Sequence, residues 1–197
     1  MWVEPRLEKL QSSVRQDQAA RVNVAQVAGD ALAACADREP KPELEGPPAP
    51  LWVSIDREKL TMAVTHAIRN AQEATEAGGR VMVRVSREGP KAVIVIEDTG
   101  VGMAQDFVRD QLFKPFQSTK GAKGMGIGAY QIRETVRAAA GEVEVESERG
   151  RGTVVRMILP LVETPMAADR LAEAERIGTG HASVSDDADI LGDAPEA

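Results

Sequence analysis

The sequence predicts an α+β two-layer sandwich, in which helices pack against one face of a sheet. Two kinds of segment support this fold class: stretches with apolar residues at helical spacing, and stretches of β-branched residues that alternate with polar ones. The composition adds a third observation. The hydrophobic fraction of 43% is ordinary for a globular protein, but only 3% of the 197 residues are aromatic, so the core must be aliphatic.

The first part of the chain is predicted to contain two helical stretches and a proline-rich connection. Residues 1–20 carry a narrow apolar seam, typical of the end of a coiled-coil helix, which is formed by Leu7, Leu10 and Val14. A second helical pattern runs from about Val24 to Ala36. The segment ADREPKPELEGPPAP that follows contains five prolines and is expected to be extended or turning chain.

The middle of the chain is predicted to form a strand, a long helix and two further strands. LWVSI at 51–55 has the residue types of a strand, and Asp56 is a suitable N-cap for a helix that reaches about Thr75. Residues 81–86 alternate as a strand with one buried face does, whereas 91–97 are apolar on both faces, as in a central strand. The long helix should bury one face, formed by Leu60, Ala63, Val64, Ala67, Ile68 and Ala71.

The last third of the chain is predicted to contain a loop, a helix and a hairpin. Residues 99–126 show no steady period and are expected to form a long functional loop. Apolar residues at helical spacing then predict a helix from about Ala129 to Ala139. Residues 141–148 and 152–159 flank an Arg-Gly-Arg turn and are expected to pair as a hairpin.

The charge distribution argues against a nucleic-acid-binding surface and sets a tail apart from the rest of the chain. The net charge is -7, and residues 161–197 alone hold nine acids and two arginines, so the remainder is neutral. We expect this tail to be an acidic, largely disordered extension. The lone Cys35 cannot form an internal disulfide, and no segment has the length of a membrane span, so a cytoplasmic domain is expected.

Asp98 follows the predicted central strand and is the first candidate binding residue. A buried carboxylate there requires a hydrogen-bond donor, and the exocyclic amine of adenine is such a donor. Gly100 and Gly102 follow directly and would leave room for a flat base against the backbone. An ordinary Asp-Thr-Gly turn at a strand end would give the same pattern.

Asn70 is the second candidate and lies on the predicted long helix. His66, Asn70 and Glu73 share one helical face at the edge of the apolar stripe. The amide oxygen of asparagine is a hard ligand that suits Mg²⁺, which also takes phosphate oxygens and water. A polar stripe facing solvent would look the same in the sequence.

The glycine-rich segment STKGAKGMGIG at 118–128 is the third candidate. It is neither a Walker loop nor the dinucleotide fingerprint, because Gly124, Gly126 and Gly128 are spaced by two and lead into a helix. The unpaired N–H groups of a helix start favour phosphate, and Lys120 and Lys123 add positive charge. A flexible surface loop remains the alternative.

The order of these groups resembles the catalytic domain of histidine kinases. Asn70, Asp98-x-Gly-x-Gly, Phe113-x-x-Phe116, Gly124-x-Gly-x-Gly and Gly152-Thr153 correspond to its N, G1, F, G2 and G3 boxes, over roughly residues 50 to 160. The segments LFKPFQSTKGAKGMGIGAYQ and HAIRNAQEAT are similar to the membrane sensor kinase of the PEP-CTERM/exosortase exopolysaccharide system. The resemblance implies the Bergerat (GHKL) ATP-binding fold, with a mixed five-stranded sheet, three main helices and an ATP lid.

The resemblance also implies a role for each matching residue. Asp98 would bind the adenine of ATP or ADP, with Gly100 and Gly102 shaping the pocket and Thr153 assisting, often through water. Asn70 would ligate Mg²⁺. Four residues would hold the phosphates under the lid: Lys120, Gly124, Gly126 and Gly128.

Two positions depart from the pattern of this family and its relatives. Many relatives carry a lysine or arginine where this chain has Glu73, so a phosphate contact from that position is not expected. Gyrase-type relatives carry a glutamate general base where this chain has His66, which argues against efficient ATP hydrolysis. His66 would instead polarise water or order the metal shell.

The chain lacks the expected phosphate acceptor, because neither His66 nor His181 stands in an H-box motif. We therefore interpret residues 1–20 as the remnant of a dimerisation helix, 21–160 as the catalytic domain and 161–197 as the tail of a fragment from a longer, membrane-anchored, homodimeric sensor. The expected partners are the dimerisation (histidine-phosphotransfer) domain of the same kinase and the receiver domain of a response regulator. The alternatives are a self-sufficient ATPase and a non-catalytic binding module.

Overall fold

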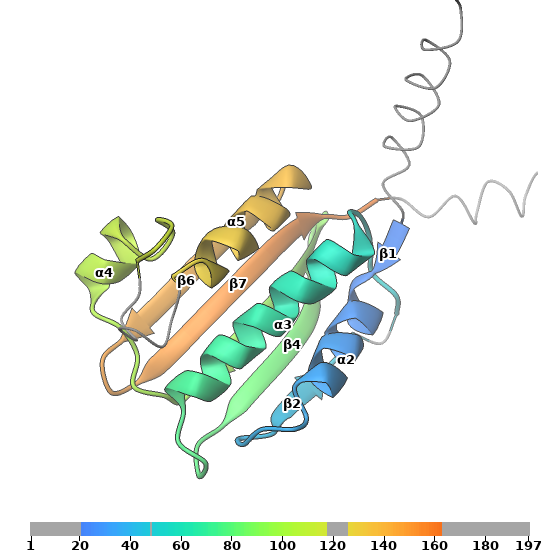
Figure 1. The fold of residues 1–197 in the computed structure, drawn as a ribbon. Helices are drawn as coiled ribbons and strands as arrows, with labels where there is room; N and C mark the ends of the chain where they lie inside the picture. Colours follow the sequence, from blue (N-terminus) through green and yellow to red (C-terminus); the bar gives the residue numbers. More distant parts are fainter. Residues whose placement is uncertain (1–20, 48, 118–125, 163–197) are drawn as a thin grey trace, which may run out of the picture. The chain divides into compact units, whose positions relative to one another are not determined.

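Three helices lie side by side on one face of a sheet (Figure 1). They are α2 (Val24–Ala34), α3 (Arg57–Ala74) and α5 (Gly128–Ala138), and a short helix, α4 (Gln105–Asp110), precedes α5. The computed structural model describes residues 21–47, 49–117 and 126–162. Within these ranges, no helix combines the length and the hydropathy needed to cross a bilayer. The predicted seam at 1–20 and residues 163–197 of the tail predicted at 161–197 lie outside them.

The main sheet has five strands in the order β2-β4-β5-β7-β6. The β2–β4 pair is parallel and the other pairs are antiparallel, so the predicted mixed five-stranded sheet is confirmed. A separate two-stranded sheet pairs β1 (Arg21–Asn23) with β3 (Trp52–Ser54). The strands of the main sheet are β2 (Pro42–Glu45), β4 (Val81–Glu88), β5 (Lys91–Asp98), β6 (Glu142–Glu148) and β7 (Gly152–Pro160).

The membership of the main sheet differs from the sequence expectation at one strand. Residues 51–55 do contain a strand, but it belongs to the small sheet, and the proline-rich segment supplies the fifth strand instead. Pro42 begins this strand at the edge of the sheet, where a missing N–H costs no ladder hydrogen bond. The prolines therefore limit the backbone conformation of this segment, but they do not prevent part of it from joining the sheet as an edge strand.

The core between the helices and the sheet is aliphatic, as predicted. The six residues expected on the inner face of α3 are all buried, with Leu60, Val64 and Ile68 fully so. Asp56 caps this helix, since its carboxylate accepts the Lys59 N–H at 3.0 Å. The strand β5 lies in the middle of the sheet, which confirms the central position predicted for 91–97. Its residues on the helix side and Val93 are buried, whereas Val95 and Glu97 on the other face are half-buried.

The sheet face opposite the helices is covered by charged side chains. Arg156 on β7 reaches Glu88 on β4 at 2.9 Å and Glu144 on β6 at 3.2 Å. The register places Val93 of β5 beneath the line from Arg156 to Glu88, and Val93 is fully buried. The aliphatic part of the arginine therefore shields an apolar residue while its charged end stays near solvent.

Candidate functional site

One end of the main sheet carries a row of polar side chains on the face that the helices cover. Asp98 on β5 lies opposite Thr153 on β7, which in turn lies opposite Ser147 on β6. Asp98 and Thr153 are only 6% and 8% exposed. The next inward row, formed by Ile96, Val155 and Val145, is apolar. Polarity on this face is thus concentrated at the end where Asp98 was predicted to bind a ligand.

The loop after Asp98 is fixed against the end of α3. The Gly100 N–H donates to Asp98 Oδ1 at 2.9 Å, and the Val101 N–H donates to the carbonyl of Ala74 at 2.9 Å. A side chain at Gly100 would clash with that same carbonyl. Glycine is therefore required here by the close approach of α3.

The other side of this loop is fixed against the β6–β7 turn. Gly102 has a φ of +61° and contacts the Glu148 carbonyl, which leaves no room for a Cβ. The Gly150 N–H donates to the Val101 carbonyl at 2.8 Å, and the Met103 N–H donates to Ser147 Oγ at 2.8 Å. The segment is therefore held between α3 and the β6–β7 hairpin.

Asn70 and Gly128 lie next to each other, as the proposed phosphate site requires. Asn70 is an exposed residue of α3, and a Cβ built on Gly128 would lie 3.5 Å from Asn70 Nδ2. Gly128 is the first residue of α5, so the N-terminus of that helix faces Asn70. His66 lies one turn before Asn70, and its buried Nδ1 makes no hydrogen bond with the residues that the structure describes.

The two ends of the glycine-rich segment are joined by a hydrogen bond. The Phe116 N–H donates to the Gly126 carbonyl at 3.0 Å. Gly126 has a φ of +65°, and a Cβ there would lie 2.5 Å from the Gln117 carbonyl oxygen, so only glycine fits. The predicted phosphate ligands Lys120 and Gly124 fall in 118–125, outside the described residues.

The two aromatic residues of the predicted F box have different environments. Phe113 is half-buried, and the Arg133 guanidinium lies 4.7 Å from the centre of its ring. Arg133 Nη2 also donates to the Phe113 carbonyl at 3.0 Å, which ties the loop after α4 to α5. Phe116 is 77% exposed and is available for contact with another molecule.

A cavity of about 690 Å³ adjoins the polar row. Its lining includes Asp98, Ser147 and Thr153 of the polar row and Gln105, Val108 and Arg109 of α4. Residues of the opposite sheet face, such as Glu97, Glu146 and Val154, line it as well. A hollow of about 350 Å³ near Lys91 and Arg137 contains none of the predicted site residues.

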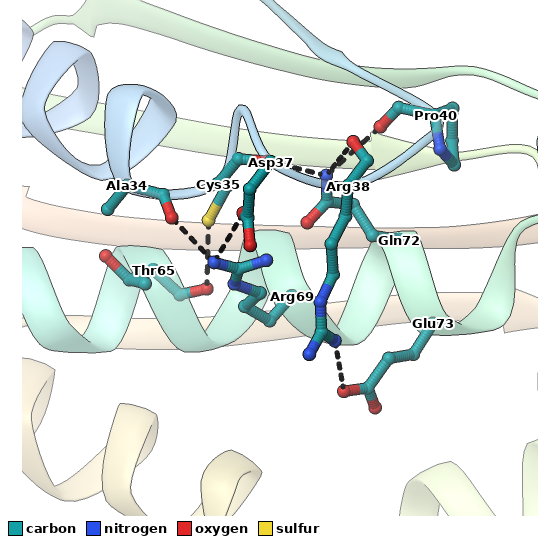
Figure 2. Close-up of polar contacts among 9 residues, drawn as sticks. All are labelled: Ala34, Cys35, Asp37, Arg38, Pro40, Thr65, Arg69, Gln72 and Glu73. Atoms are coloured by element: carbon teal, nitrogen blue, oxygen red, sulfur yellow. Dashed lines mark hydrogen bonds and ion pairs between the residues drawn. The ribbon is translucent and has the colours of Figure 1, made fainter.

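The turn between α2 and β2 is bound to the side of α3 that faces α2 (Figure 2). Gln72 Nε2 donates to the carbonyls of Cys35, Arg38 and Pro40 at 3.0, 3.0 and 3.2 Å. Glu73, which stands where many relatives carry a lysine or arginine, lies 3.6 Å from the guanidinium of Arg38.

Two titratable groups in this turn have shifted pKa values. Its hydrogen bond with Arg69 lowers the pKa of the Asp37 carboxyl, although partial desolvation opposes this. Burial raises the pKa of the Cys35 thiol, so this thiol stays protonated at neutral pH.

Sequence reasoning missed two residues of this region, Ser147 and Arg133. Ser147 occupies the third inward position of the alternating segment after Val143 and Val145, and its polar side chain interrupts that apolar series. This interruption was a readable signal. The sequence contains no comparable signal for Arg133, because its partner Phe113 is 20 residues away.

Residues 55–163 match the family described as histidine kinase-, DNA gyrase B- and HSP90-like ATPase. Among curated proteins, the chain is 34% identical over 126 residues to histidine protein kinase DivJ of Caulobacter vibrioides, which is 62% of this chain and 21% of that protein. It is 37% identical over 109 residues to sporulation kinase C of Bacillus subtilis, which is 55% of this chain and 25% of that protein. The chain therefore spans only about a quarter or less of these relatives.

Solved structures show the same fold. The mycobacterial sensor histidine kinase MprB aligns with a TM-score of 0.65 and 27% identity, over 74% of this chain and 99% of that one. Full-length ShkA in complex with AMPPNP aligns with a TM-score of 0.63 and 22% identity, over 74% of this chain and 31% of that one.

Proposed function

Since this chain belongs to the histidine kinase-, DNA gyrase B- and HSP90-like ATPase family, we propose that it is the catalytic ATP-binding part of a sensor histidine kinase. Residues 21–160 would bind Mg·ATP and present the γ-phosphoryl group to a histidine on a dimerisation domain. In that transfer the bond from phosphorus to ADP breaks, a bond from phosphorus to the histidine nitrogen forms, and the nitrogen loses its proton to solvent. The observation that carries the proposal is the buried Asp98–Thr153 pair at the sheet end, close to α3.

The polar row would recognise the adenine base. Asp98 would accept a hydrogen bond from the exocyclic amine, with Thr153 beside it. Gly100 and Gly102 would shape the pocket through the loop that α3 and the β6–β7 turn hold in place.

The residues around Asn70 fit a magnesium triphosphate. Asn70 offers a hard oxygen ligand, and the start of α5 at Gly128 offers backbone N–H groups for phosphate oxygens. Mg²⁺ neutralises phosphate charge when it is bound. Gly126, with its positive φ, would set the path of the chain that leads to the start of α5. We propose Lys120 and Gly124 as further phosphate ligands.

His66 would act on the magnesium site from α3, one helical turn before Asn70. Its Nδ1 is buried, so only Nε2 is available to order water in the outer shell of the metal. A role in that shell agrees with its place one helical turn before Asn70.

The proposed partners are those of a sensor kinase. The phosphate acceptor would be a histidine on the dimerisation domain, and the phosphoryl group would then pass to the receiver domain of a response regulator. We propose that the whole protein is a membrane-anchored homodimer with this domain on the cytoplasmic side. The similarity to the exosortase-system sensor kinase remains a prediction.

Binding of a fluorescent ATP analogue tests the site assignment. Asp98→Asn should weaken binding about tenfold or more, because the amide places a donor against the amine. Asn70→Ala should remove most of the gain in affinity that Mg²⁺ gives, while binding without Mg²⁺ should change little. Glu58→Gln, at an exposed residue of α3, is the control and should bind like the unmodified chain. Unchanged affinity in both site variants would refute the assignment.

A phosphate-release assay separates this function from that of a self-sufficient ATPase. We expect no steady release from the isolated chain, because position 66 carries an imidazole instead of a glutamate base. Sustained turnover that Asn70→Ala abolishes would favour the ATPase instead. Absence of any Mg·ATP stabilisation in a thermal shift would favour a non-catalytic binding module.

A further inference from the structure

We propose that Ser147 is a specificity-determining residue for the purine base, because it fixes the direction of the Thr153 hydroxyl. The inference rests on the proposed function, in which the base lies beside Asp98. Ser147 would not touch the base itself. It would act through Thr153, its neighbour on the adjacent strand, and is therefore a positioning residue.

The hydrogen bonds around Ser147 determine where each proton lies. Ser147 Oγ has one proton and two lone pairs. It lies 2.8 Å from the Met103 N–H, which can only donate, and 3.0 Å from the Gly152 carbonyl, which can only accept. The single proton of Ser147 therefore goes to Gly152. The third contact, 2.9 Å to Thr153 Oγ1, must then use the proton of Thr153.

This arrangement leaves Thr153 with only acceptor capacity toward the base. Its one proton is used by Ser147, and its lone pairs remain. The neighbouring Asp98 carboxylate also only accepts when it is ionised. Both side chains therefore present acceptor atoms at this end of the sheet, and Thr153 has no proton left to offer a ligand.

A base with an amine at its 6 position meets that requirement, and a base with a carbonyl there does not. The amine of adenine has two protons to give. The 6-oxo group of hypoxanthine or guanine would face two acceptors, and their burial at 6% and 8% exposure limits compensation by water. An acceptor of the ligand placed against buried acceptors of the site is a strong source of discrimination.

Isothermal titration of the full chain with Mg·ATP and Mg·ITP tests the inference, because ITP replaces the amine with a 6-oxo group. The unmodified chain should prefer ATP by about a hundredfold or more. In Ser147→Ala the Thr153 hydroxyl is free to rotate and donate to the 6-oxo group, so this preference should fall about tenfold. Ser86→Ala, at a half-buried serine of β4, is the control and should keep the full preference.

A double-mutant cycle tests whether the effect passes through Thr153. Thr153→Val should itself lower the preference, and adding Ser147→Ala to it should change the preference no further. An unaltered preference in Ser147→Ala, or an equal further loss in the double variant, would overturn the inference. If Ser147→Ala binds neither nucleotide, Thr153→Val decides: a lowered preference supports the inference and an unaltered one overturns it. If the unmodified chain binds no ATP, the proposed function itself fails.

Discussion

At the scale of single residues, Gly152 allows the polar row to form. It has a φ of +100°, and a side chain there would clash with the Asp98 carbonyl. The close approach of β7 to the end of β5 at this point places Thr153 directly opposite Asp98. The spacing of the two candidate binding residues thus depends on the absence of one methyl group.

Gly152→Ala should therefore lower the free energy of unfolding by about 3 kcal/mol or more, from backbone strain and the clash together. Gly150→Ala is the matched control, because Gly150 also has a positive φ, of +78°, but its Cβ position is open. It should cost only about 1 kcal/mol. Urea denaturation measures both, and equal losses would show that the contact with Asp98 is unimportant.

At the scale of elements, one buried amide makes three of the hydrogen bonds that attach the turn after α2 to α3, beside the contacts of Arg69 with Ala34 and Asp37. Gln72 is 4% exposed, and its two amide protons serve three carbonyls from the turn after α2 (Figure 2). No other described side chain donates to these three carbonyls. The position of α3, and with it Asn70, is thereby linked to a turn that was predicted only as irregular chain.

Gln72→Ala should lower the free energy of unfolding by about 2–3 kcal/mol, since buried carbonyls lose their donor. Gln131→Ala, at an exposed glutamine of α5, should change it by less than about 0.5 kcal/mol. Chemical denaturation followed by circular dichroism gives both values. A loss below 1 kcal/mol in Gln72→Ala would mean that water replaces the amide.

The elements that the sequence predicted well are those whose signal is local. The apolar face of α3 and the alternation of the β6–β7 hairpin are written within each segment, and both are confirmed. The strand Pro42–Glu45 was missed because its evidence is its partner β4, almost forty residues later. Asp98 and Asn70 could be predicted as site residues because their motifs are local, whereas the role proposed for Ser147 depends on cross-strand neighbours.

At the scale of the whole described domain, two arginines connect the strands on the face without helices. Arg84 contacts Glu45 at 3.5 Å and Glu97 at 2.6 Å, and Arg156 contacts Glu88 and Glu144. The hydrogen bond to Glu88 is the main cause of the raised pKa of Arg156. These ion-paired side chains cover the sheet face that the helices do not cover.

Arg156→Ala should lower the free energy of unfolding by about 1–2 kcal/mol, because it uncovers Val93 as well as removing the ion pairs. Arg156→Met should cost about 0.5 kcal/mol, since it keeps an aliphatic cover over Val93. Comparing urea midpoints at low and high salt separates the two contributions. Equal losses in both variants would assign the whole effect to charge.

The glutamates on the outermost strands also bear on how copies of this domain behave at high concentration. Among the described residues, no strand pairs with the outer side of β2 or of β6, and such borders recruit further strands. Here the β6 border carries Glu142, Glu144, Glu146 and Glu148, and the β2 border carries Glu43 and Glu45. Two copies meeting border to border would bring these glutamates together, which disfavours growth of the sheet into a polymer, although arginines within the domain contact four of the six carboxylates.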